Sequence, residues 1–127
     1  MSVLETHEAQ CHVRTRDLFD FVDITDDVQD AVSASGLRTA RATVFSPGEG
    51  CSLVMNERES GLLKDIRRAM DRLGAAGPME RTKTVGMRSV VIPVVDGRLR
   101  LGTWQRLLVF ELEEPSERVV VVQIVGE

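Results

Sequence analysis

The stretch VVDGRLRLGTWQ, which spans residues 94–105, decides the fold because it carries a complete hairpin signal. Asp96-Gly97 is a dipeptide that tight hairpin turns favour, since both central residues of such a turn take positive φ. Apolar, mostly β-branched residues fill positions 90–95 before this turn, and a shorter alternating run follows it over 98–101. The pattern predicts two antiparallel strands joined at the Asp-Gly turn.

Two more strands are expected downstream of this hairpin. Residues 106–113 and 118–125 are rich in apolar and β-branched side chains, and turn-forming residues over 114–117 separate them. We expect these two runs to pair with each other. Together with the hairpin they would form a four-stranded meander that two helices cover on one face.

Upstream of the hairpin, residues 60–73 carry the clearest helical signal. Ser60 is the predicted N-cap of this helix, and Gly74 is its predicted end. An irregular connection is expected over 75–86. The helix is amphipathic because apolar residues recur three and four positions apart, namely Leu62, Leu63, Ile66, Ala69, Met70 and Leu73.

A shorter amphipathic helix is predicted between Thr25 and Gly36. Thr25 is its expected N-cap, and Asp26 and Asp27 would lie in the first turn, where the helix dipole favours negative charge. Gly36 can take the left-handed conformation that ends many helices. Strands are expected around this helix, with 10–15 and 18–24 as a first strand pair, followed by 37–45 and 51–56.

Length and composition indicate one folded domain of the α+β class. The 127 residues are 43% hydrophobic and 28% charged, a balance that supplies both a core and a polar surface. We therefore expect a single domain over 1–127. It would be mainly an antiparallel β-sheet covered by two helices.

Charge and hydropathy exclude several classes of partner. A net charge of −4 argues against nucleic-acid binding, which draws on clustered Lys and Arg. The most apolar run, over 119–125, is too short to span a membrane, and the first ten residues lack a secretory pattern. We expect a cytoplasmic protein without a membrane partner, in which Cys11 and Cys51 are reduced thiols.

Five blocks of sequence carry a family resemblance. They are DITDDV at 23–28, ATVFSP at 42–47, MNE at 55–57, VVDGRLRLGTWQ at 94–105 and VVQIVGE at 121–127. In this order they closely resemble the YjbQ-like family, whose members are described as secondary thiamine-phosphate-synthase-like proteins. The resemblance spans most of the chain. It implies an α+β subunit that assembles as a homotrimer, with sites at or near the subunit boundaries.

The chain departs from this family at its histidines. Where the resemblance implies a His-Thr-Thr turn, the sequence has Gly48-Glu49-Gly50, and the connection over 75–86 contains no histidine. Glycine can neither bind a metal through a side chain nor act as a general acid or base. We therefore expect no metal in the family-type position and no cofactor. The two histidines of the chain, His7 and His12, lie in the N-terminal stretch.

The candidate site residues come from the retained blocks and the altered turn. Glu57 and Cys51 are the candidate catalytic groups, one as a pocket acid and the other as a nucleophile. Each has a structural alternative, Glu57 as a charged residue between strand and helix and Cys51 as a thiol without an activating base. Trp104 can instead be a packing or interface residue, and the Gln105 side chain can stabilise a turn. The candidate ligand contacts are Glu49, Ser52, Asn56, Thr103, Trp104 and Gln105.

Two functions from different classes fit this pattern. The first is a non-catalytic homotrimer for binding or assembly, because the scaffold blocks are kept while the histidines are lost. The second is an enzyme with an altered active site in the retained cleft, acting on a small phosphorylated or heterocyclic metabolite, since new sites arise on old folds. The first accounts better for the loss of the family chemistry, and both stay open.

Overall fold

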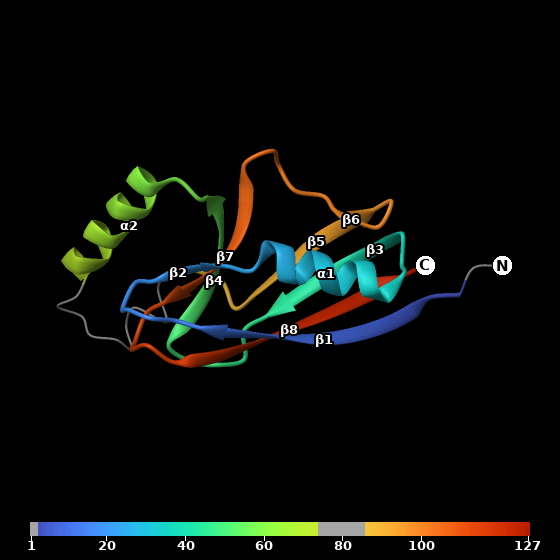
Figure 1. Ribbon diagram of the computed structural model, residues 1–127, viewed down its shortest axis with the longest axis horizontal. Coiled ribbons are helices and arrows are strands. Elements are labelled where there is room, and N and C mark those ends of the chain that lie inside the picture. Colours follow the sequence, from blue (N-terminus) through green and yellow to red (C-terminus); the bar gives the residue numbers. More distant parts are fainter. Residues whose placement is uncertain (1–2, 74–85) are drawn as a thin grey trace.

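The chain folds into two antiparallel β-sheets and two helices, an α+β arrangement (Figure 1). The computed structural model describes residues 3–73 and 86–127. The helices are α1 (Thr25–Ser35) and α2 (Ser60–Leu73). A five-stranded sheet contains, in spatial order, β1 (Glu5–Arg14), β8 (Glu117–Gly126), β3 (Thr39–Phe45), β5 (Ser89–Val95) and β6 (Arg98–Leu99). A three-stranded sheet contains β2 (Phe21–Asp23), β7 (Gln105–Glu111) and β4 (Cys51–Glu57).

A first core lies between the inner faces of the two sheets and α1. Alternate residues of β3 and β8, such as Ala42, Val44 and Val122, are fully buried because they point into this layer. They pack in one cluster with Leu107 of β7 and Val28 of α1. In Figure 1, α1 lies along the five-stranded sheet, and it contacts β1, β6, β7 and β8.

A second core lies on the other face of the three-stranded sheet, where α2 covers it. Phe21 of β2 stacks on Phe110 of β7 with ring centroids 4.2 Å apart. Leu63 and Met70 of α2 are buried in the same cluster. Ala69, which the amphipathic pattern assigns to the apolar stripe, is exposed. β7 is therefore covered on both faces, which explains its continuous apolar run.

The hairpin predicted from Asp96-Gly97 is confirmed. β5 and β6 pair across these two residues, whose φ angles are 53° and 76°. Gln29 of α1 holds the hairpin with its side-chain amide. Its Nε2 donates to the carbonyl oxygen of Gly97 at 3.0 Å, and its Oε1 accepts from the N–H of Leu99 at 2.9 Å.

The predicted four-stranded meander is wrong. β7 pairs with β2 and β4 in the small sheet, whereas β8 pairs with β1 and β3 in the large sheet. The turn between β7 and β8 thus carries the chain from one sheet to the other. The physical reason is burial, because β7 is covered on both faces while β8 alternates between buried and less buried residues.

The predicted N-terminal strand pair is also wrong. β1 pairs with β8 along its whole length, from Glu5 opposite Gly126 to Arg14 opposite Glu117. Figure 1 shows the two strands side by side along the lower edge of the molecule. β2 instead pairs with β7 in the small sheet. Two segments that are adjacent in sequence therefore belong to different sheets.

The start of α1 differs from the prediction, while its end agrees. Gly36 follows the helix in the left-handed conformation, with φ 73°. Thr25 is the first residue of the helix, and its N–H donates to Oδ1 of Asp23 at 3.0 Å, while Ile24 at the N-cap position provides no side-chain cap. The Thr25 Oγ1 instead accepts a hydrogen bond from the N–H of Leu107 at 2.8 Å. The hydroxyl group thus docks α1 onto β7.

The start of α2 is capped by a residue other than the predicted Ser60. The two carboxylate oxygens of Glu59 accept from the N–H groups of Gly61 and Leu62, each at 2.8 Å. These hydrogen bonds hold the pKa of Glu59 below its ordinary value. The predicted helix end at Gly74 and the connection over 75–85 lie outside the described residues. No helix in the described part of the chain has the length and apolar character to cross a membrane.

Candidate functional site

The predicted site residues separate into two groups at opposite ends of β4. Cys51 begins this strand opposite Glu111 of β7, and Glu57 ends it opposite Gln105. A strand of seven residues at about 3.3 Å per residue places its two ends roughly 20 Å apart. The structure therefore does not bring Cys51 and Glu57 into one small cleft.

At the first end, the Cys51 thiol is buried beside a hydroxyl group. Cys51 Sγ lies 3.3 Å from Ser46 Oγ, and both residues are 1% exposed. They line a pocket of about 150 Å³ together with Gly48 and Arg118. Among the described residues, the Cys51 thiol has the Ser46 hydroxyl as its hydrogen-bond partner and interacts electrostatically with the Arg118 guanidinium. No histidine that could act as its base lines this pocket.

The strongest electrostatic contact at this end is a buried ion pair between β7 and β8. Arg118 donates to both carboxylate oxygens of Glu111, from Nε at 3.1 Å and from Nη2 at 2.7 Å. Thr15 Oγ1 donates to the same carboxylate at 2.6 Å, and the N–H of Glu113 donates at 3.1 Å. Burial would raise the pKa of Glu111, but these hydrogen bonds outweigh it and keep that pKa below its ordinary value. Glu111 is thus held as a carboxylate.

The other two candidate residues at this end, Glu49 and Ser52, differ in their exposure to solvent. The Glu49 residue is exposed, and its carbonyl oxygen accepts from Arg118 Nη1 at 2.9 Å. Ser52 is buried, and its Oγ has no hydrogen-bond partner among the described residues. Because neighbours along a strand alternate in direction, Ser52 and Cys51 lie on opposite faces of the small sheet.

At the second end of β4, the candidate residues face solvent. Glu57 and Thr103 are exposed, and Trp104 is 72% exposed. Gln105 holds the turn before β7, because its Oε1 accepts from the N–H of Gly102 at 3.1 Å. Asn56 is half-buried and lines a mostly apolar groove of about 290 Å³ beside α2. This end presents an open surface rather than an enclosed site.

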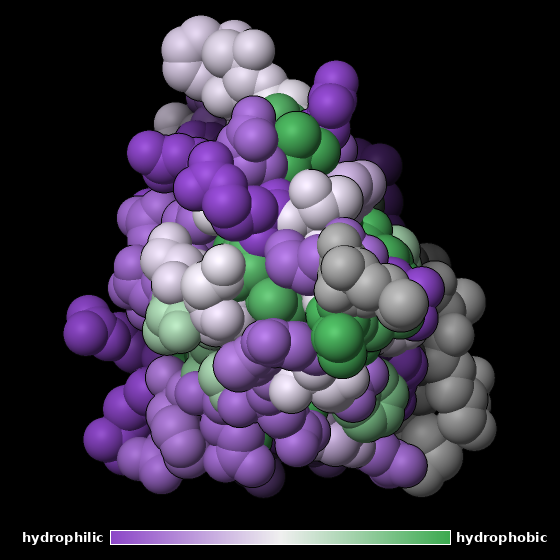
Figure 2. Space-filling view, turned by 90° about the vertical axis from the view of Figure 1, so that its right-hand side faces the viewer, coloured by the Kyte–Doolittle hydropathy of each residue, from purple (hydrophilic) through white to green (hydrophobic). Residues whose placement is uncertain are grey.

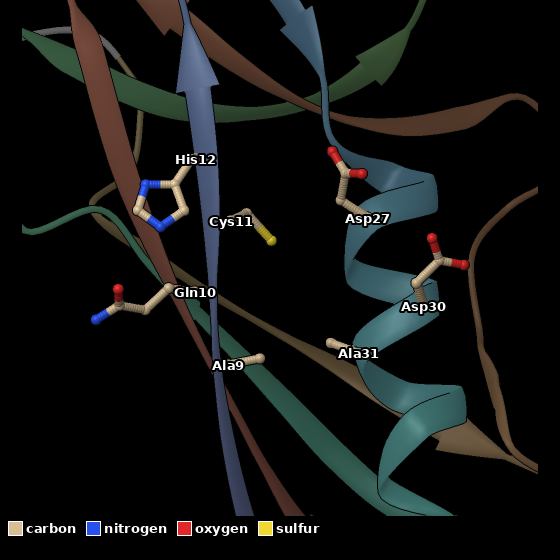
Figure 3. Close-up of a pocket in the computed structure, with 7 residues that line it drawn as sticks. All are labelled: Ala9, Gln10, Cys11, His12, Asp27, Asp30 and Ala31. Carbon is tan, nitrogen blue, oxygen red and sulfur yellow. The ribbon is translucent and has the colours of Figure 1, made fainter.

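A groove between β1 and α1 lies away from both groups of candidates. Its volume is about 390 Å³, and its lining includes Cys11, Asp27 and Asp30. Figure 3 shows Ala9 and Cys11 on the side of β1 that faces α1, while His12 lies on the opposite side. Burial, together with the negative charge of Asp27, raises the pKa of the Cys11 thiol. Cys11 is therefore a protonated thiol at neutral pH.

Metal-binding groups do not gather in the part of the chain that the structure describes. Over 3–73 and 86–127, no three His, Cys, Asp or Glu side chains come together as they would around a metal ion. The expectation that no zinc occupies the family-type position stays a prediction. Elemental analysis of washed protein would contradict it by finding about one tightly bound zinc per subunit.

The sequence matches a known protein family. Residues 9–127 match the family described as UPF0047 protein YjbQ-like. The chain belongs to this family. A UPF0047 protein from Archaeoglobus fulgidus is 36% identical to it over 123 residues, which cover 87% of this chain and 95% of that protein. The resemblance carried by the five sequence blocks is therefore confirmed.

Solved structures show the same YjbQ-like fold. The crystal structure of a YbjQ-like protein of unknown function from Sulfolobus solfataricus superposes with a TM-score of 0.89 at 30% identity. That match covers 98% of this chain and all of the other one. A hypothetical protein from Aeropyrum pernix matches with a TM-score of 0.86 at 32% identity, covering 95% of this chain and 99% of the other.

Within this YjbQ-like fold, sequence reasoning missed the Glu111–Arg118 pair. A signal for it is present, because Glu111 interrupts the apolar run LLVFEL over 107–112. An acid inside such a run must be paired when the strand is buried. The partner is harder to find, since Arg118 lies beyond the turn on a strand of the other sheet.

Proposed function

We propose that this YjbQ-like chain is a homotrimer that serves binding or assembly, without the histidine-dependent thiamine-phosphate-synthase-type chemistry. The observation that supports assembly is the outer face of the five-stranded sheet, which neither α1 nor α2 covers. Val91 of β5 is 58% exposed on this face, and Phe45 of β3 is 43% exposed. Apolar side chains gathered on one exposed face are typical of protein–protein contacts.

The strand register brings these apolar side chains together. Phe45 lies opposite Val121 of β8, and Val91 lies opposite Thr43 of β3. Val119, two residues before Val121, is also exposed and has the same orientation. The apolar surface therefore spans three neighbouring strands, an arrangement that a second and third copy of the sheet would bury.

The placement of the candidate catalytic groups supports a role other than family-type catalysis. Cys51 and Glu57 lie at opposite ends of β4. The two histidines of the chain lie on β1, where His12 is exposed and the Nε2 of His7 lies 3.2 Å from Glu5 Oε2. An imidazole at either position lies in a different sheet from β4. Acid–base chemistry at β4 would have to proceed without one.

Native mass spectrometry of the purified chain tests the proposal. We expect a trimer at micromolar concentration, and we expect Val91→Glu to dissociate it, because the carboxylate would be buried without a partner. Leu18→Glu is the matched control, since Leu18 is 41% exposed but lies outside the sheets. A stable wild-type monomer would overturn the trimer. A trimer that tolerates both Val91→Glu and Val119→Glu would exclude this face as its interface.

A further inference from the structure

We infer that the groove between β1 and α1 binds an extended basic segment of another protein, which adds to the five-stranded sheet as a strand beside β1. β1 has ten residues and is an outer strand of this sheet, since among the described residues it pairs with β8 alone. Long edge strands are normally covered, because their free N–H and C=O groups recruit further strands. The contact needs one subunit only, so it goes beyond the proposed homotrimer and does not depend on it.

The strand register identifies the free backbone groups of β1. Thr39 and Glu127 exchange two backbone hydrogen bonds, at 3.1 and 2.8 Å, so the odd-numbered residues of β8 bond to β3. The even-numbered residues of β8 therefore bond to β1, where they lie opposite its odd-numbered residues. The N–H and C=O groups of Glu8, Gln10 and His12 consequently point away from β8. They have no hydrogen-bond partner in the described part of the chain.

The odd-numbered residues of β1 form one wall of the groove. Ala9 and Cys11 face α1, and Ala31 lies across from them on the helix (Figure 3). The two small alanine side chains leave room for the inward side chains of an added strand in a groove of about 390 Å³. Cys11 is 8% exposed, and its thiol has no hydrogen-bond partner among the described residues. It can therefore donate to an acceptor on the bound segment.

Two carboxylates on α1 set the charge of that segment. Asp27 and Asp30 line the groove, both are exposed, and neither has an ion-pair partner among the described residues. Residues three apart on a helix have Cβ atoms about 5–6 Å apart. Alternate residues of a strand point to the same face and lie roughly 7 Å apart. The geometry therefore fits a segment with Lys or Arg at two positions that one residue separates.

The surface around the start of β1 also favours a polar partner. β1 begins at the right-hand end of Figure 1, and this end faces the viewer in Figure 2. The surface seen there is mostly hydrophilic. A segment that runs along β1 to this end would meet polar groups, which favour charged and polar side chains over apolar ones.

Fluorescence anisotropy with synthetic peptides tests the inference at low ionic strength, where charge contacts are least screened. The probe is a seven-residue peptide, rich in threonine and valine, with lysine at its third and fifth positions. We expect saturable binding, which Asp27→Asn/Asp30→Asn weakens at least about tenfold. An isomer with adjacent lysines should bind at least about tenfold more weakly, since only one of them can face α1. Asp65→Asn is the control, because Asp65 is exposed and lies on α2.

Gln10→Pro tests the strand addition itself. It removes an N–H that points away from β8, a position where edge strands tolerate proline, so the fold should be kept while binding falls at least about tenfold. Gln10→Ala keeps the N–H and should bind like the wild type. Two peptides, each N-methylated at one alternate set of amides, repeat the test without changing the protein. Only the peptide methylated on the amides that face β1 should lose binding.

Four results would overturn the inference. No saturable binding up to about 1 mM peptide would exclude the site. Equal affinity for spaced and adjacent lysines would show charge attraction without a strand register. Binding that neither Gln10→Pro nor either set of N-methyl groups weakens would exclude strand addition. A change of subunit number in Gln10→Pro, measured by native mass spectrometry, would mean that another copy of this chain occupies the edge. The homotrimer is judged on the mass of the wild type, so failure of either proposal is recognised separately.

Discussion

Glu59 and Glu57 are two residues apart, yet the structure gives them opposite roles. Glu59 caps α2 through the N–H groups of Gly61 and Leu62, whereas Glu57 is exposed and its side chain makes no hydrogen bond to the described residues. The capping role at this helix, which the sequence analysis predicts for Ser60, therefore belongs to Glu59.

We expect Glu59→Ala to lower the melting temperature, because two N–H groups at the start of α2 lose their acceptor. Glu57→Ala is the matched control and should leave the melting temperature unchanged. Thermal unfolding followed by circular dichroism measures both variants. A loss of stability in Glu57→Ala equal to that in Glu59→Ala would contradict this assignment.

Gly50 is required by both its conformation and its neighbours. Its φ is 90°, and an added Cβ would lie 2.3 Å from Glu113 Oε2 and 2.9 Å from Arg118 Nη2. We expect Gly50→Ala to cost about 1–3 kcal/mol in the free energy of unfolding, as strained backbone positions do. Gly48→Ala should cost less than about 0.5 kcal/mol, since nothing lies within 4 Å of its added Cβ. Equal losses in chemical denaturation would show that the turn tolerates a side chain.

Among the contacts between secondary-structure elements, the Glu111–Arg118 ion pair joins the two β-sheets. Glu111 belongs to β7 of the small sheet and Arg118 to β8 of the large sheet, and their side chains are 0% and 12% exposed. Thr15, which follows β1, donates to the same carboxylate. The contact therefore fixes how β7, β8 and the end of β1 meet.

We expect Arg118→Met to cost about 3–5 kcal/mol in the free energy of unfolding, because it leaves the Glu111 carboxylate buried without its cation. Adding Glu111→Gln removes that charge, so the double variant should recover part of the loss. Urea denaturation measures both free energies. A double variant that is less stable than Arg118→Met alone would contradict the reading that the unpaired charge causes the loss.

For the molecule as a whole, carboxylates with a lowered pKa make stability depend on pH, and Asp23 and Glu111 are the half-buried and buried ones among them. Burial would raise the pKa of Asp23, but hydrogen bonds from Arg106 and Thr25 outweigh it and lower that pKa, as those around Glu111 do. A carboxylate whose folded-state pKa is lowered stabilises the fold above its unfolded-state pKa. That contribution is lost as the pH falls through the folded-state value.

We therefore expect the free energy of unfolding to fall as the pH drops below about 4. Glu111→Gln should be less stable than the wild type at neutral pH and should lose less on acidification. Denaturation curves across a pH series at one protein concentration provide the measurement. A variant profile as steep as that of the wild type would show that other groups govern acid unfolding.

The features that were predicted correctly from the sequence depend mainly on local signals, although the two predicted N-caps, Thr25 and Ser60, were wrong. The Asp96-Gly97 hairpin, the end of α1 at Gly36 and the amphipathic helix α2 each depend on residues within a few positions of one another. The five family blocks were also sufficient to predict the α+β fold, which the match over 9–127 confirms. These features follow from backbone preferences and side-chain periodicity, which residues close together in the sequence determine.

Strand partners and the geometry of the site were decided only by the tertiary structure. Nothing local distinguishes a turn that joins partners from the turn between β7 and β8, which joins different sheets. That choice depends on burying both faces of β7, a property of the packed layers. The same packing places Cys51 and Glu57 at opposite ends of β4 and pairs Glu111 with Arg118. Such contacts join residues that sequence spacing does not relate, because long-range burial selects them.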